Sequence, residues 1–261
     1  MEREDRLSRL IDLIIDEGSV HVEQVIEQFD VSAATARRDL DALAAQQLVT
    51  RTRGGAMVNP TSGDLPLRYR TVRQWREKNT IALKVAQLVS PGDVVAFNGG
   101  TTTTSAAQEL GVRVAGDPRF EEASTTVVTN AVNIANDLMV RPHLRIVVTG
   151  GVARARSYEL IGPLSSLILP QISIDTLYLG VSAVDLEHGL FTHHEGEAAV
   201  NAAMVARAHR TVVVADSTKL RATAFARICG LDEVDALITD DGVADADVAA
   251  LAERGVETIV A

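Results

Sequence analysis

The chain has 261 residues, of which 46% are hydrophobic and 23% are charged, so it can bury one or two sizeable cores. Its formal net charge of −10 excludes a protein that is basic over its whole surface, and any contact with nucleic acid must come from a local patch of cations. The single cysteine, Cys229, excludes an intramolecular disulfide and a cysteine-rich zinc site. The start MEREDRLSRL is too charged for a secretory signal and no apolar run could span a membrane, so we expect a cytoplasmic protein.

The N-terminal part of the chain predicts three short helices. Apolar residues recur every three or four positions over residues 7–14 and again over residues 22–29, which indicates one buried face of a helix in each case. Ser32 then suits a helix N-cap, because its hydroxyl can accept a backbone N–H of the first turn. A third helix follows and carries Arg37 and Arg38. Two helices joined by a tight turn, the second bearing arginines, are typical of a helix-turn-helix.

The next segment, LVTRTRGGAMV at residues 48–58, predicts a hairpin. Arg51 and Arg53 alternate with threonines as in a strand, and Gly54-Gly55 permits a sharp return. Local charge favours DNA contact, since residues 31–58 carry a net charge of +2. Because arginine binds both phosphates and base edges, we interpret the third helix and the hairpin as a DNA-binding surface rather than as solvated arginines.

The segment VSAATARRDLDALAAQQLVTRTRGGA resembles the DNA-binding signature of the DeoR family of bacterial transcriptional regulators. The resemblance implies a winged helix-turn-helix DNA-binding domain over residues 1–58. One departure is Ala36, where the family often carries a larger aliphatic residue. The DNA-binding residues that the resemblance implies are Ser32, Thr35, Arg37, Arg38, Arg51 and Arg53.

Residues 59–66, NPTSGDLP, have the composition of a linker. We place the linker at residues 59–77 and a second domain at residues 78–261. The stretch RYRTVRQWREK at residues 68–78 has five cations and one acid, and either contacts DNA phosphates or forms a solvated helix.

Short apolar runs alternate with helical stretches throughout the second half of the chain. Runs of four or five Val, Ile and Leu residues are typical of strands that are buried on both faces of a parallel sheet. The alternation predicts a doubly wound α/β domain with a mostly parallel sheet, in which ligands bind outside the carboxyl ends of the strands. We expect strands at 94–97, 125–129, 145–149, 176–180, 211–215 and 236–239, and helices at 79–89, 105–110, 131–139, 198–208 and 246–254.

The first of these strands ends in NGGTTTT, residues 98–104. Two glycines let the backbone approach an anion, and the first amides and threonine hydroxyls of the following helix can donate to a phosphate. The loop lacks the lysine of a P-loop and the spacing of GxGxxG, so neither nucleotide motif fits. A glycine-rich turn with a helix cap is the alternative. Further polar or permissive residues near strand ends are Asn130, Gly150, Gly151, Asp175, Glu197 and Lys219, which together predict a site for a phosphorylated sugar or polyol.

These residues extend the DeoR-family resemblance over nearly the whole chain. The family's second domain is similar to the ribose-phosphate isomerase fold and generally senses a phosphorylated sugar without converting it. The resemblance implies that Lys219 contacts phosphate or sugar oxygens and that Asp175 and Glu197 contact hydroxyls. The other effector-binding residues that it implies are Asn98, Gly99, Gly100, Thr101, Thr102, Thr103, Asn130, Gly150 and Gly151.

Two departures from the family pattern adjoin each other in this loop. Asn98 replaces the usual aspartate, and Gly99 replaces the usual small hydroxyl residue. Because an amide donates as well as accepts hydrogen bonds and carries no charge, the effector is expected to differ from the family's common ones. The stretch at residues 111–124 is expected to be a surface insertion.

His188, His193 and His194 crowd one segment and are followed by Glu195. Imidazole and carboxylate groups bind zinc, but adjacent histidines on an extended loop point in opposite directions. A polar loop near the effector, direct effector contact and a metal site all remain open.

The sequence predicts a DNA-binding transcriptional regulator, most often a repressor in the resembling family, of a carbohydrate-metabolism operon. A homo-oligomer, dimer or tetramer, is expected because helix-turn-helix dimers match two-fold operators. No cofactor and no membrane contact is expected, and no residue is assigned as a metal ligand. The alternative is a sugar-phosphate isomerase with Glu197 or Asp175 as the base. Asn98 counts against an isomerase, because it replaces a carboxylate that the family usually has at this position. The N-terminal 57 residues would also have no role in an isomerase.

Overall fold

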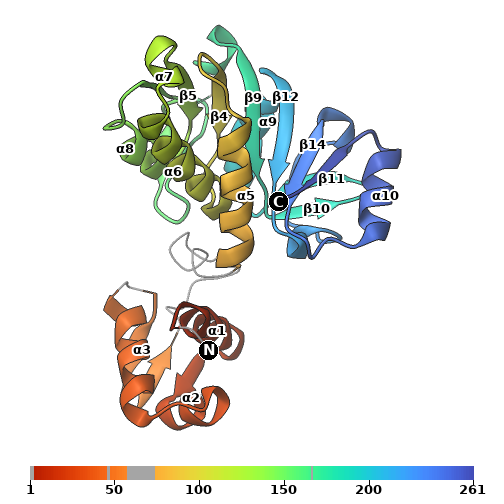
Figure 1. Ribbon diagram of the computed structural model, residues 1–261. Helices are drawn as coiled ribbons and strands as arrows, with labels where there is room; N and C mark the ends of the chain where they lie inside the picture. Colours follow the sequence, from red (N-terminus) through yellow and green to blue (C-terminus); the bar gives the residue numbers. More distant parts are fainter. Residues whose placement is uncertain (1–2, 46–47, 58–73, 166) are drawn as a thin grey trace. The chain divides into compact units, whose positions relative to one another are not determined.

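The computed structural model describes residues 3–45, 48–57, 74–165 and 167–261 (Figure 1). It contains two compact units, Met1–Trp75 and Arg76–Ala261. Within the described ranges, no helix is long and apolar enough to cross a membrane.

The first unit is a winged helix-turn-helix, which confirms the predicted fold. Its helices are α1 (Arg3–Glu17), α2 (Val22–Phe29) and α3 (Ala33–Ala45), and its strands are β1 (Ser19–His21), β2 (Thr50–Thr52) and β3 (Gly55–Met57). The antiparallel sheet has the order β1-β3-β2, and β1 was not predicted because three residues are too few to show a period. The buried core of the unit includes Leu10, Ile11, Ile14, Val25, Leu40 and Leu43.

The wing turns at Gly54, whose φ of 94° is a left-handed conformation that glycine adopts without strain. At Gly55 the chain passes so close to β1 that a Cβ atom would lie 1.9 Å from the carbonyl oxygen of Val20. The Gly-Gly pair of the sequence motif therefore serves both the turn and the close approach of two strands.

The second unit is built on a seven-stranded sheet in which every pairing is parallel, with the order β15-β14-β12-β9-β4-β5-β6. Its strands are β4 (Val94–Phe97), β5 (Thr125–Thr129), β6 (Leu144–Val148), β9 (Ile174–Gly180), β12 (Ala208–Val214), β14 (Ala236–Thr239) and β15 (Glu257–Val260). The predicted parallel α/β domain is confirmed. The strand β15 was not predicted, because an edge strand is only partly buried and its residues do not form a continuous apolar run.

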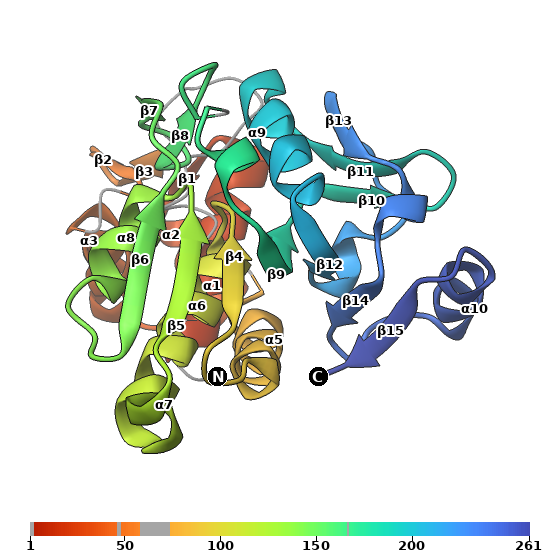
Figure 2. The ribbon, with the colours of Figure 1, turned by 90° about the horizontal axis from the view of Figure 1, so that it is seen from above.

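Two layers cover the sheet, as Figure 2 shows. Alternate side chains of each strand point to opposite faces, so Val95 and Phe97 pack on one side and Ala96 on the other. The first layer consists of α5 (Trp75–Leu88), α6 (Thr101–Gly116), α7 (Arg119–Glu122) and α8 (Val132–Leu138). The second contains α9 (Glu195–Val205), α10 (Asp245–Glu253) and a small antiparallel sheet of β10 (Ala183–Asp185), β11 (Gly189–Thr192) and β13 (Ala226–Cys229).

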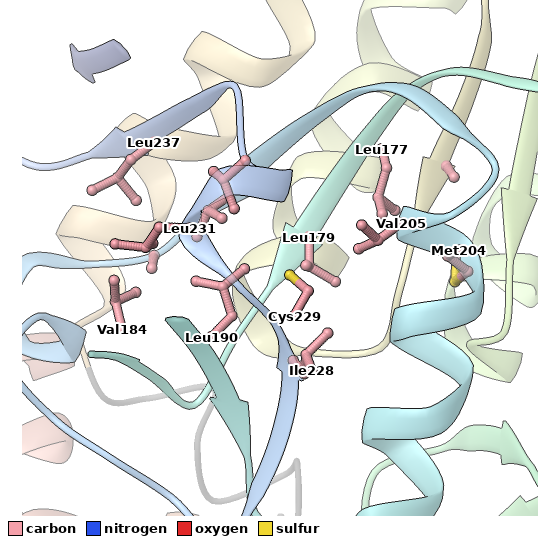
Figure 3. Packing of buried hydrophobic residues seen from close by; sticks show 14 of the residues in the cluster. Leu177, Leu179, Val184, Leu190, Met204, Val205, Ile228, Cys229, Leu231 and Leu237 are labelled. Atoms are coloured by element: carbon pink, nitrogen blue, oxygen red, sulfur yellow. The ribbon is translucent and has the colours of Figure 1, made fainter. Parts of the chain in front are cut away.

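Figure 3 shows the core of this second layer. Cys229 is a buried free thiol among Leu179, Leu190 and Ile228, and burial raises its pKa to about 12. It therefore packs as a small apolar residue. A separate two-stranded hairpin, β7 (Val152–Arg154) and β8 (Glu159–Ile161), follows β6.

Residues 111–124, expected to be a surface insertion, are only partly at the surface. The helix α6 continues to Gly116, and Phe120 of α7 is fully buried. The guanidinium of Arg113 lies 5.3 Å from the centre of the Phe120 ring and donates to the carbonyl of Val89 over 2.7 Å. This segment therefore closes the first layer of the core.

The predicted linker, residues 59–77, falls largely on residues 58–73, which lie outside the described part of the chain. The same holds for most of the cationic stretch at residues 68–78. The helix α5 begins at Trp75, four residues before the expected start at residue 79.

Candidate functional site

The start of α3 is fixed by the Ser-x-x-Thr pair of the sequence motif. The hydroxyl of Ser32 accepts the backbone N–H of Thr35 over 3.2 Å, and the two hydroxyls lie 3.0 Å apart. Ser32 is therefore the N-cap of α3, as its position in the sequence predicted. The two side chains bind each other and orient the helix that follows.

The Arg-Arg-Asp-Leu motif on α3 divides between solvent and core. Arg37 and Arg38 are exposed, and Arg38 also donates to the carbonyl of Ala34 over 3.2 Å. Asp39 is buried, and its Oδ2 lies 2.6 Å from the Nε of Arg6 on α1. The hydrogen bond and charge of Asp39 raise the pKa of Arg6. The motif thus presents two cations outward while its carboxylate ties α3 to α1.

The two wing arginines differ in their surroundings. The Nε of Arg51 lies 2.9 Å from Asp41 of α3, and its Nη1 donates to the carbonyl of Gly55. Arg53 is exposed at the wing turn. Both arginines are predicted DNA-binding residues, and they differ in that the alternation along the strand places Arg51 against α3, where Asp41 pairs with it.

The strand ends of the second unit meet at one edge of the sheet, because all its strands are parallel. Asn98 follows β4 and is buried, with its Nδ2 donating to the carbonyl of Gly180 over 2.9 Å. The N–H of Gly180 donates in return to Asn98 Oδ1 over 2.8 Å. The side chain of Asn98 therefore joins the ends of β4 and β9, and both its polar atoms are engaged there.

The helix α6 begins at Thr101, directly after the two glycines. Thr103 and Thr104 donate through their hydroxyls to the carbonyl of Gly100, at 3.2 and 2.6 Å. Thr102 and Thr103 are buried, whereas Thr101 is half-buried. The first amides of α6 have no carbonyl partner within the helix, so they are oriented to donate to a group outside it.

A glutamate that sequence reasoning did not single out lies against this loop. Glu159 of β8 is buried, and its Oε1 accepts hydrogen bonds from the backbone N–H of Gly99 and from Asn130 Nδ2, each over 3.2 Å. The fit depends on glycine, because a Cβ atom at Gly99 would lie 2.1 Å from Glu159 Cγ. Sixty residues separate the partners in the sequence, and no motif marks Glu159, so only the folded hairpin reveals the contact.

Glu159 is one of two neighbouring buried carboxyl groups. Glu197 of α9 accepts hydrogen bonds from Arg154 Nη1 and from the hydroxyl of Thr192, each over 3.0 Å. Burial, followed by the charge of the neighbouring Glu197, raises the pKa of Glu159 to about 8. Glu197, which the resemblance predicts to contact an effector hydroxyl, forms an ion pair with Arg154 of β7, a strand that the sequence did not predict.

Gly150 and Gly151 both have positive φ values, 75° and 126°, at the end of β6. The hydroxyl of Ser165 donates to the carbonyl of Gly150 over 2.7 Å, and a Cβ atom on Gly151 would lie 2.0 Å from Ser165 Oγ. These glycines let the chain leave β6 and begin the hairpin that carries Glu159.

The carboxyl ends of β12 and β14 are joined by a second carboxylate, to which sequence reasoning gave no role. Asp240 accepts the N–H and the hydroxyl of Ser217, each over 2.7 Å. This contact fixes the short turn Ser217–Lys219, which places Lys219 at the same edge as α6.

Asp175 does not belong to this edge. It lies at the beginning of β9, where it is exposed and accepts the N–H of Val94 over 2.8 Å. Because β4 and β9 are parallel and Val94 begins β4, Asp175 lies at the amino edge of the sheet. Its proposed contact with an effector hydroxyl is therefore corrected.

The histidine segment has structural contacts. His194 caps α9, since its Nδ1 accepts the N–H of Gly196 over 3.0 Å, and His188 Nδ1 lies 3.2 Å from Asp185 in the β10–β11 turn. Among the residues that the structure describes, no group of three His, Cys, Asp or Glu side chains could hold a metal.

Two family models match this chain. A DeoR-like helix-turn-helix domain matches residues 6–62, and a DeoR C-terminal sensor domain matches residues 73–241. The chain belongs to the DeoR family. It is a DNA-binding transcriptional regulator, and the isomerase alternative falls away because the relatives are named as regulators.

This DeoR-family chain is similar over its whole length to named proteins. It is 32% identical to the glycerol-3-phosphate regulon repressor of Escherichia coli K12, over 92% of each chain. It is also 32% identical to the transcriptional repressor GlcR of Bacillus subtilis, over 100% of this chain and 97% of that protein. A solved D-ribose-5-phosphate isomerase shares 20% identity over 55% of this chain and 53% of its own, with a TM-score of 0.39.

Proposed function

We propose that this regulator represses a carbohydrate-metabolism operon and that a phosphorylated sugar or polyol controls its affinity for the operator. The observation that supports the effector best is the loop before α6, where Gly99, Gly100 and the first helical amides form an anion-binding feature at the carboxyl edge of the sheet. The relatives named as repressors support the direction of regulation.

The DNA-binding surface in this proposal comprises Arg37, Arg38 and Arg53. All three are exposed cations on α3 or at the wing turn, and helices of this kind enter the major groove. Ser32 and Thr35 lie at the N-terminus of α3, where a helix can also bind a phosphate through its amides. Arg51 positions the wing.

The effector-binding surface in this proposal is the loop that opens α6 together with Lys219. Backbone amides from Gly99 to Thr103 would bind the phosphate, and Lys219 would contact phosphate or sugar oxygens. Asn130 is fully buried, and its Oδ1 has no hydrogen-bond partner among the described residues, so it suits a hydroxyl donor of the ligand. Asn98, Gly150, Gly151 and Glu197 would shape the site.

We place the DNA-binding domain at residues 1–58, the linker at 59–77 and the effector domain at 78–261. A homo-oligomer, most simply a dimer, would match a two-fold operator. The protein would act in the cytoplasm.

The experiment is a gel shift on the DNA upstream of the protein's own gene at fixed salt. Arg37→Ala with Arg38→Ala should abolish the shift, whereas Arg207→Ala with Arg254→Ala, which removes the same charge from exposed positions of the second unit, should not. Equal binding by both double variants would refute α3 as the reading helix.

The effector is then sought by adding phosphorylated sugars and polyols to the same gel shift. One class should weaken the shift, while its dephosphorylated forms should not. A complex that no phosphorylated compound alters would refute the proposed control.

A further inference from the structure

The anion-binding loop already has a partner inside the protein. Glu159 Oε1 accepts the N–H of Gly99, the residue just before the N-cap of α6, over 3.2 Å. Its side chain lies within the space that any Cβ atom at Gly99 would need. The carboxyl group therefore covers one side of the loop that the effector's phosphate is proposed to use.

The surroundings of Glu159 favour a neutral acid. Its Oε1 accepts hydrogen bonds from Gly99 and Asn130. Burial and the charge of Glu197, which is itself paired with Arg154, raise the pKa of Glu159. Glu159 is therefore the group of this pair that holds a proton near neutral pH.

The backbone of the hairpin is anchored, so the side chain is the part that can yield. Leu160 donates to the carbonyl of Asn130 over 2.7 Å, and Val132 donates to the carbonyl of Tyr158 over 2.9 Å. These bonds fix β8 beside the loop that follows β5. Rotation of the Glu159 side chain would release the Gly99 amide without breaking them.

We propose that Glu159 is a specificity-determining residue of the effector site, because its carboxyl group occupies the Gly99 amide and a ligand phosphate must displace it. The inference rests on the proposed function, since it concerns the same loop. A bare phosphate loses affinity by this competition. When Glu159 moves away, Asn130 Nδ2 loses its hydrogen bond to Glu159, and Asn130 Oδ1 has no partner among the described residues. An effector with a hydroxyl group that bonds to Asn130 therefore regains the affinity that a bare phosphate loses.

The test is calorimetric titration of the full-length protein with inorganic phosphate near neutral pH. Glu159→Ala removes the competitor and should bind phosphate about tenfold more tightly, the value of one hydrogen bond to an anion. Glu159→Asp, whose carboxyl group is one methylene too short to reach Gly99, should also bind more tightly. Glu159→Asp replaces Glu159→Ala in the test if the alanine variant fails to fold.

Glu159→Gln is the decisive comparison, because glutamine has the shape and the hydrogen-bonding pattern of a neutral glutamic acid. It should bind phosphate as the wild type does. Glu195→Ala is the matched control, since it removes an exposed carboxylate in the first turn of α9 and should leave the affinity unchanged.

The outcomes separate the two proposals. If the wild type, Glu159→Ala and Glu159→Asp all bind phosphate with the same affinity, the inference is overturned and the proposed effector loop still stands. If Glu159→Gln binds phosphate as tightly as Glu159→Ala does, the inference is also overturned. The charge of Glu159, and not its position on the Gly99 amide, would then weaken phosphate binding. Absence of phosphate binding in the wild type and all variants overturns both proposals.

Discussion

Asn98 and Gly180 exchange two hydrogen bonds between a side-chain amide and a strand end, at 2.9 and 2.8 Å. Only a group that both donates and accepts can make this pair, because Gly180 offers one N–H and one C=O. The carboxylate usual in the family could accept from the N–H but would face the carbonyl without a proton to share. The amide at this position thus serves the junction of β4 and β9.

Asn98→Asp should therefore destabilise the second unit. The buried carboxylate would lie against the carbonyl of Gly180, at a cost of about 1–3 kcal/mol for the lost bond and unpaired group. Urea denaturation followed by circular dichroism would measure it. Asn136→Asp, the same change at an exposed position, is the control and should cost little. Equal midpoints for the two variants would contradict a structural role for the amide.

Gly99 and Glu159 should show strong energetic coupling. Gly99→Ala places a methyl group where Glu159 Cγ now lies, which should cost about 1–3 kcal/mol as overpacking. In a Glu159→Ala background the same change should cost much less, since the space is then free. A double-mutant cycle of unfolding free energies checks this, and additive effects would show that the two side chains do not compete for space.

The raised pKa of Glu159 makes stability depend on pH. The folded protein holds this proton up to about pH 8, whereas the unfolded chain releases it near 4.5, so Glu159 contributes stability below 4.5 that is lost as pH rises toward 8. Glu159→Gln, which still faces Glu197 and Arg154, cannot titrate. The stability of this variant relative to wild type should increase between about pH 5 and about pH 8. Parallel stability curves across that range would contradict a protonated Glu159.

Asp39 should act on folding and not on DNA directly. Its carboxylate is buried and bound to Arg6, so Asp39→Ala should lower the stability of the first unit by about 1.5–3 kcal/mol, the range for a hydrogen bond to a charged group. Thermal melting should show this loss. The double change at Arg37 and Arg38 should instead abolish DNA binding with the melting temperature retained, and Glu27→Ala, at an exposed position of α2, serves as the control.

The two wing arginines should differ in their effect on salt dependence. Arg53→Ala should reduce the slope of log affinity against log salt by about 1, as expected for one lost phosphate contact. Arg51→Ala should change the slope less, because its guanidinium is bound to Asp41 and Gly55. Binding assays at several salt concentrations measure the slope for each variant. Identical slopes for Arg51→Ala and Arg53→Ala would contradict the proposal that Arg53 contacts DNA while Arg51 positions the wing.

Much of the fold could be predicted from local patterns. The Ser32 cap, the apolar period of the helices and the Gly-Gly turn of the wing depend on residues a few positions apart. The strands buried on both faces appear as continuous apolar runs, and their shared direction brings Asn98 and Lys219 to one edge. The short strands β7 and β8 left no such signal, so the carboxyl group that they carry was missed.

The sequence by itself determined the two kinds of domain and the glycine-threonine loop, because helix capping and hydrophobic periodicity are local effects. Only the tertiary structure decided which polar side chains meet. It assigned Asp175 to the amino edge, paired Arg51 with Asp41, and brought Glu159 onto Gly99 across sixty residues of chain. Such contacts depend on strand order and on the path of a hairpin, which the whole fold sets by burying its apolar faces, and no local pattern of residues encodes them.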